Sequence, residues 1–161
     1  MQITEPVTML TDYAMGAASL FLVRVLLRHI GPSNRTTIRL WVISYAGVCI
    51  ASLLGGTYHG FASYFSVSGL RALWNVTIYA SGFAGGCIVA GAVASDVRGH
   101  EEGRKWLIAG TLATFAGMAV QQTGFRHGAA FNHNDTYHLI QIAALYLFFR
   151  CARVVEDRRE S

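Results

Sequence analysis

Residues 6–27 read PVTMLTDYAMGAASLFLVRVLL, an apolar run whose single acidic side chain, Asp12, lies near its start. A helix needs about 20 mostly apolar residues to cross the hydrocarbon core of a bilayer, and this run is long enough. Thr4, Glu5 and Pro6 mark its start, because proline is favoured in the first turn of a helix. The stretch therefore predicts a transmembrane helix that holds a carboxyl group near one end.

Four further apolar runs follow along the chain. Composition agrees with them, since 53% of the 161 residues are hydrophobic and only 14% are charged, unlike the charge-rich usage of soluble domains. The connectors are short, so residues 1–161 are expected to form one transmembrane domain. We predict an all-α fold, an integral membrane bundle of five transmembrane helices. With the first run, the spans lie at about residues 6–27, 38–61, 70–94, 106–120 and 136–155.

Cationic side chains gather in alternate connectors. Lys and Arg in short loops stay on the cytoplasmic side of a membrane. Only Arg71 and Arg126 lie in the connectors of the other side. The asymmetry predicts the N-terminus outside and the C-terminus inside, and the charged tail from Glu156 to Ser161 is expected to fray. The cations on the inner side are Arg28, Arg35, Arg39, Arg98, Arg104, Lys105, Arg150, Arg153, Arg158 and Arg159.

Polar side chains collect at the outer ends of the five runs. Polar and ionisable groups within a helix bundle are expensive and usually face a cavity or each other. One polar pocket, open to the outer side, is therefore the simplest interpretation. Its expected members are Glu5, Asp12, His59, Asp135 and His138, with Gln121, Gln122 and Gln141 at the same level.

The spacing of these groups is compatible with a metal site. Asp135 and His138 are three residues apart, and Asn134 and His138 are four apart, so either pair can share a helical face. Imidazole nitrogens and carboxylates are suitable zinc ligands, and three protein ligands keep one position open for water. A set of His59 and His138 with Asp135, or with Asp12 in its place, would supply them.

This pattern resembles the superfamily of alkaline ceramidases, adiponectin receptors and related membrane hydrolases. The superfamily has Ser-x-x-x-His on one helix, Asp on the next and His-x-x-x-His on the last, with three histidines that bind zinc. His59 and His138 match two of those histidines. Gly55, Asn75 and Asn134 stand where the Ser, the Asp and the remaining His are expected, and the superfamily has seven helices.

The resemblance implies a zinc-dependent membrane hydrolase. Its zinc-bound water would attack an amide or ester of a membrane lipid, with Asp12 or Asp135 as the catalytic proton acceptor. The stretches TEPVTMLTDY (residues 4–13) and NDTYH (residues 134–138) are also similar to an uncharacterised family of bacterial membrane proteins. That similarity implies location in the bacterial inner membrane.

Other interpretations stay open. The same side chains could form a hydrogen-bonded network that fixes helix packing in a non-catalytic binding or accessory subunit, with other membrane subunits as partners. Asp135 is suited to be the N-cap of the last helix. A solute or proton pathway would need polar groups through the inner half, where they are scarce. Walker, GxGxxG, GxSxG and HExxH motifs are absent and the cations follow the loops, so no nucleic-acid partner is expected.

Small and aromatic residues predict local packing. Gly55, Gly56 and Gly60 allow close approach of a neighbouring helix, and Gly82 and Gly86, spaced as GxxxG, predict tight helix packing inside the bundle. Tryptophan rings favour the headgroup level of a membrane. Interfacial anchors are therefore expected at Trp41, Trp74 and Trp106.

Overall fold

A computed structural model describes residues 2–124 and 131–158, and this part of the chain is almost entirely helical. The predicted all-α fold with five α helices is confirmed. The only pairing of β type among the described residues is an isolated bridge between Ser95 and Asp157. The helices are α1 (Pro6–Leu27), α2 (Arg35–Phe61), α3 (Val67–Ala94), α4 (Glu101–Thr123) and α5 (His133–Val154), with a 3₁₀ helix η1 (Ala62–Tyr64) after α2.

The helices extend past several of the predicted runs at their polar ends. α1 has the predicted bounds, whereas α4 begins at Glu101 rather than Trp106, and α5 begins at His133 rather than Thr136. Hydropathy detects the apolar middle of a helix, but backbone hydrogen bonding continues through its charged and capped ends. By length and composition, three helical segments are apolar enough to cross a membrane: α1, α2 together with η1, and α3.

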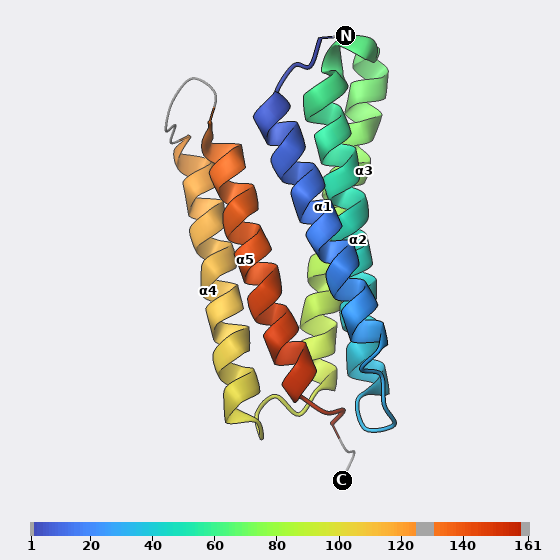
Figure 1. Ribbon diagram of the computed structural model, residues 1–161, viewed down its shortest axis with the longest axis vertical. Coiled ribbons are helices and arrows are strands. Elements are labelled where there is room, and N and C mark those ends of the chain that lie inside the picture. Colours follow the sequence, from blue (N-terminus) through green and yellow to red (C-terminus); the bar gives the residue numbers. More distant parts are fainter. Residues whose placement is uncertain (1, 125–130, 159–161) are drawn as a thin grey trace.

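The helices pack side by side as two groups (Figure 1). α2 packs against both α1 and α3, α4 packs against α5, and the two groups meet where α5 lies against α1 and α2. We call the end that holds the chain's N-terminus the N-terminal end of the bundle, and the opposite one the C-terminal end. α1, α3 and α5 begin at the N-terminal end, and α2 and α4 finish there (Figure 1).

A buried aromatic cluster joins α2 to α5. The ring centroids of Trp41 and Phe148 are 6.0 Å apart, and the Tyr45 hydroxyl donates a 2.7 Å hydrogen bond to the Leu145 carbonyl. Trp41 is fully buried, so its prediction as an interfacial anchor is wrong. The reason is Gly91 on α3, because a Cβ atom there would lie 2.5 Å from Trp41 Nε1, so that glycine is needed to leave room for the indole.

Glycines on α2 bring α1 close, as predicted. A Cβ atom at Gly56 would lie 2.6 Å from the Tyr13 ring, and one at Gly55 would lie 3.2 Å from Asp12 Oδ2. The prediction for α3 is wrong, because no described residue of another helix lies within 4 Å of a Cβ atom built at Gly82 or Gly86. This GxxxG pair faces away from the rest of the bundle.

The face of α3 that meets α2 is a different one. Ser44 Oγ donates a 2.7 Å hydrogen bond to the Ala84 carbonyl. A Cβ atom at Gly47 would lie 3.1 Å from the Ala84 side chain. α3 therefore uses one small-residue face for α2 and leaves the GxxxG face open.

The chain segment after α5 closes the C-terminal end of the bundle. The Asp157 carboxylate accepts hydrogen bonds from the backbone N–H groups of Thr36, at 2.9 Å, and Thr37, at 2.7 Å. These are orphan donors in the first turn of α2, whose N-cap residue Asn34 makes no side-chain cap. Asp157 thus caps α2 from the far end of the sequence.

Backbone hydrogen bonds fix the same segment in place. The Asp157 N–H donates to the Ser33 carbonyl at 2.7 Å, and the Arg158 N–H donates to the Ala94 carbonyl at 2.8 Å. The expectation that the tail frays is therefore wrong for residues 156–158, and residues 159–161 lie outside the described part. We call residues 155–158 the C-terminal clasp.

Gly56→Ala is expected to destabilise the protein by about 1–3 kcal/mol, because the new methyl group would overlap the Tyr13 ring and push α1 from α2. The measurement is unfolding of the detergent-solubilised protein, followed by circular dichroism. Gly82→Ala is the matched control. It makes the same change on an open face and should leave stability unchanged or raise it by up to about 1 kcal/mol. Equal stabilities of the two variants would contradict the α1–α2 contact.

Asp157→Asn is expected to lower the free energy of unfolding by about 1 kcal/mol at neutral pH, because the helix cap loses its charge. Burial acts to raise the pKa of Asp157, but hydrogen bonds from Thr37 and Thr36 outweigh it and hold the pKa below its ordinary value. A depressed pKa gives stability above the pKa of the unfolded chain, and that stability is lost as pH falls through the folded pKa.

Thermal unfolding at neutral and acidic pH checks this expectation. The gap between the wild type and Asp157→Asn should close on acidification, since the wild-type carboxyl group is then protonated. A gap that persists unchanged at acidic pH, or no gap at neutral pH, would show that the carboxylate does not cap α2.

Candidate functional site

The site is built at the N-terminal end of the bundle, where α5 begins. Asn132 is the N-cap of α5, and its side-chain oxygen accepts hydrogen bonds from the backbone N–H groups of Asn134, at 2.7 Å, and Asp135, at 3.4 Å. Asp135 Oδ2 in return accepts the Asn132 N–H at 2.7 Å, which completes a capping box. The predicted N-cap was therefore at the wrong position, because Asp135 occupies the third helical position.

Sequence reasoning missed Asn132. The signal was present, since an Asn three residues before an acidic residue at the start of an apolar run is typical of a capping box. Asn132 also ties α5 to α1, because its side-chain amide donates a 3.2 Å hydrogen bond to Thr8 Oγ1. Thr8 is buried, with 1% of its surface exposed.

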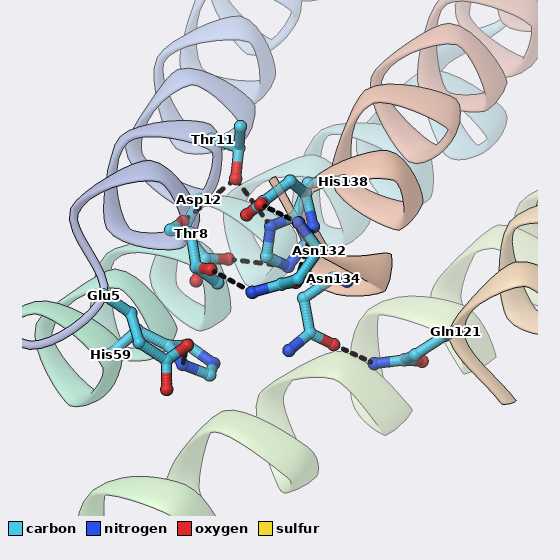
Figure 2. A network of polar contacts seen from close by, with 10 residues as sticks. Glu5, Thr8, Thr11, Asp12, His59, Gln121, Asn132, Asn134 and His138 are labelled. Atoms are coloured by element: carbon cyan, nitrogen blue, oxygen red, sulfur yellow. Dashed lines mark hydrogen bonds and ion pairs between the residues drawn. The ribbon is translucent and has the colours of Figure 1, made fainter. Parts of the chain in front are cut away.

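One turn further along α5, His138 bridges two residues of α1 (Figure 2). Its Nδ1 lies 3.0 Å from Thr11 Oγ1, and its Nε2 lies 3.2 Å from Asp12 Oδ1. The exposed fractions of Asp12 and His138 are 4% and 6%, so water screens this contact little. We call Thr11, Asp12 and His138 the α1–α5 lock.

The geometry of the hydrogen bonds requires a proton in the lock. The Thr11 hydroxyl has a single hydrogen, and both the Thr8 carbonyl oxygen and His138 Nδ1 lie 3.0 Å from Thr11 Oγ1 as acceptors for it. When the hydroxyl donates to Nδ1, Nε2 carries the ring N–H and donates it to Asp12 Oδ1. When the hydroxyl donates to Thr8, Nδ1 carries the ring N–H, and Nε2 of a neutral ring presents a lone pair to Asp12 Oδ1. Two lone pairs repel, so the contact is attractive only with a proton between them. Asp12 and His138 therefore share one proton.

His59 belongs to a separate pair. Its Nδ1 lies 3.0 Å from Glu5 Oε2, and the Glu5 side chain is 44% exposed. The backbone N–H of Glu5 also donates to the His59 carbonyl at 3.1 Å, which holds the start of α1 against the end of α2. The ring packs edge-on to Trp74 of α3. Figure 2 shows the Glu5–His59 pair apart from the α1–α5 lock.

The predicted zinc ligands do not converge in this arrangement. No group of three or more His, Cys, Asp or Glu side chains in residues 2–124 and 131–158 is placed to hold a metal ion. Of the predicted residues, only His138 and Asp12 approach as a pair of donors, while His59 faces Glu5 and Asp135 caps α5. The residues therefore do not fit a zinc ion as they stand, and zinc binding stays a prediction.

Two buried carboxylate oxygens have no hydrogen-bond partner among the described residues, Asp12 Oδ2 and Asp135 Oδ1. Asp12 Oδ2 faces Gly55, where the glycine offers no donor group. Such unsatisfied oxygens are unusual in a folded protein. The proton between Asp12 and His138 therefore contributes to stability, because burying a carboxylate without a proton beside it would cost free energy at this position.

The remaining polar residues expected in the pocket lie between α4 and α5 or face solvent. Gln121 Nε2 lies 3.4 Å from Asn134 Oδ1, and Gln141 Nε2 donates to the Thr114 carbonyl at 3.2 Å. Gln141 therefore joins α4 to α5 and does not continue the face of His138 toward α1, and Gln122 is exposed. Arg126, in the connector between these helices, lies outside the described residues.

Residues 7–101 and 81–157 match the family of unknown function named DUF6962. The chain belongs to this DUF6962 family. Asp12, His59, Asp135 and His138 fall within the matched segments of this DUF6962 chain, and Glu5 precedes them. No curated protein and no solved structure matches the chain.

The α1–α5 lock predicts that Asp12 and His138 are energetically coupled. Asp12→Ala and His138→Ala should each destabilise the protein, and the double variant should lose less than their sum by about 1–3 kcal/mol, because each single change leaves a buried partner unpaired. Denaturation of the four proteins in mixed micelles measures the coupling.

Asp12→Ala combined with His59→Ala is the matched control for this cycle. His59 pairs with Glu5, so these two changes should add within about 0.5 kcal/mol. If Asp12 couples equally to both histidines, or to neither, the separation of the two pairs is contradicted.

Proposed function

We propose that this chain is a non-catalytic integral membrane protein, a binding or accessory subunit. In it, the α1–α5 lock joins the α4–α5 hairpin to α1, α2 and α3. The observation that carries the proposal is that both ring nitrogens of His138 contact protein groups, Thr11 and Asp12. A histidine used in this way has no nitrogen left for a substrate or a metal ion. The site thus resembles a packing network more than an open reaction centre.

We also propose that all five helices cross the membrane. α4 has 23 residues and α5 has 22. At about 1.5 Å per residue these helices are about 33–35 Å long, enough to cross a hydrocarbon core of about 30 Å. The positive charge in the connectors of the C-terminal end supports the orientation with the N-terminus outside and the C-terminus inside. The bacterial inner membrane remains the proposed location.

Outward-facing apolar side chains support contact with lipid or other membrane subunits. On α3, Val76, Tyr79, Phe83, Val89 and Val93 are each at least half exposed. Soluble monomers rarely carry so large an apolar face without a partner. In a membrane, the same face meets acyl chains or a helix of another subunit.

A zinc-dependent lipid hydrolase is the second candidate, and one distance favours it. Two ligands of a tetrahedral zinc ion, each about 2.0–2.2 Å from the metal, lie about 3.3–3.6 Å apart. His138 Nε2 and Asp12 Oδ1 are 3.2 Å apart. A zinc ion would supply a water activated for attack on an amide or ester, but the third ligand, Asp135 or His59, would have to leave its present partner.

Elemental mass spectrometry of the detergent-purified chain distinguishes the two candidates. After zinc reloading and gel filtration, the protein is expected to hold far less than one zinc per chain, because only two donors converge. Hydrolysis of lipid amides and esters is expected to stay at background.

His59→Ala and His138→Ala are tested in parallel, with His100→Ala at the C-terminal end of the bundle as the control. About one zinc per chain in the wild type and in His100→Ala, absent from the other two variants, would overturn the non-catalytic proposal in favour of the hydrolase.

A further inference from the structure

A groove of about 320 Å³ lies between α3 and α4 near the C-terminal end of the bundle. Its lining is mostly apolar and includes Ile88, Val89 and Val93 of α3 and Leu107 of α4. Val89 and Val93 are 62% and 60% exposed, so the described chain leaves this surface uncovered.

Two arginines also line this apolar groove. Arg98 comes from the connector between α3 and α4, and Arg158 comes from the C-terminal clasp. The Arg158 N–H bonds to the Ala94 carbonyl, so the clasp holds this arginine beside the end of α3. Among the described residues, neither guanidinium forms an ion pair, and no acidic side chain lines the groove.

Arg158 has a second environment. It also lines an adjoining hollow with Asp96, Glu156 and Asp157. The Asp157 carboxylate is already bonded to the first turn of α2. Arg98 lines only the apolar groove, where it has no acidic neighbours, so it is the better placed of the two arginines to bind an anionic ligand.

We infer that this groove binds an anionic phospholipid. The phosphate contacts the guanidinium groups of Arg98 and Arg158, and an acyl chain lies along the apolar lining between α3 and α4. A guanidinium presents paired N–H donors that match phosphate oxygens, and basic pockets between membrane helices on the cytoplasmic side commonly bind anionic lipid headgroups. The inference rests on the proposed membrane insertion, with the C-terminal end on the cytoplasmic side.

Charge complementarity selects lipid over protein as the occupant. A helix from a second copy or another subunit would cover the valines and Leu107, but it would need an acidic residue at the level of the arginines. An anionic phospholipid supplies both the apolar chain and the negative charge in one molecule.

Native mass spectrometry of the full chain, released from mild detergent with added phosphatidylglycerol or phosphatidylcholine, tests the inference. The wild type should retain phosphatidylglycerol in preference to phosphatidylcholine. Each of Arg98→Gln and Arg158→Gln should reduce that preference about fivefold. Arg71→Gln, which removes an exposed arginine at the other end of α3, is the matched control and should keep the preference.

Three outcomes would overturn the lipid site. These are no preference for phosphatidylglycerol in the wild type, an equal loss in Arg71→Gln, or a dimer without retained lipid, which would identify a second copy as the occupant. Flotation of the reconstituted protein with phosphatidylcholine vesicles at alkaline pH is measured separately. Protein that floats but shows no lipid preference defeats this inference alone, whereas protein that does not float defeats the proposed membrane insertion.

Discussion

The fold depends on the contact between Asp12 of α1 and His138 of α5. The groups formed by α1 to α3 and by α4 with α5 pack together mainly where α5 lies against α1, so this surface largely fixes their relation. Burying a carboxyl group and an imidazole here without each other would cost considerable free energy, because water does not reach them. Thr11 forms a hydrogen bond with His138 Nδ1, and a proton lies between His138 Nε2 and Asp12 Oδ1.

Two other contacts hold α5, each of a different chemical kind. Between the two ends of the bundle, Trp41 of α2 packs on Phe148, and the Tyr45 hydroxyl donates a hydrogen bond to the Leu145 carbonyl. At the C-terminal end, Asp157 caps α2 and the clasp bonds to the loop before α2 and to the end of α3. Polar interactions therefore close both ends, while apolar packing fills the length between them. The outer faces of α3 and α4 are left for the surroundings.

The sequence was sufficient to predict the features that depend on hydropathy and on the direction of each helix. Apolar runs predicted five helices, and alternation of direction placed Asp12 and His138 at one end. The sequence could not predict which side chains contact each other, because these contacts depend on how each helix is rotated about its axis. His59 faces Glu5 rather than His138, and Gln141 faces Thr114 of α4. The burial of Trp41 could not be predicted, because the space for its ring depends on Gly91 of another helix. The zinc ligands were predicted from residue type alone, and the sequence does not show whether such side chains converge on one point.

Hydrogen exchange measured by mass spectrometry on the first turns of α5 tests the shared proton most directly. The wild type, Asp12→Asn and Asp12→Ala are compared in the same detergent. The Asn amide can donate an N–H to the lone pair of Nε2, so Asp12→Asn should keep most of the wild-type protection, whereas Asp12→Ala should lose it. Equal protection in all three proteins, or an equal loss in both variants, would contradict the account of the α1–α5 lock.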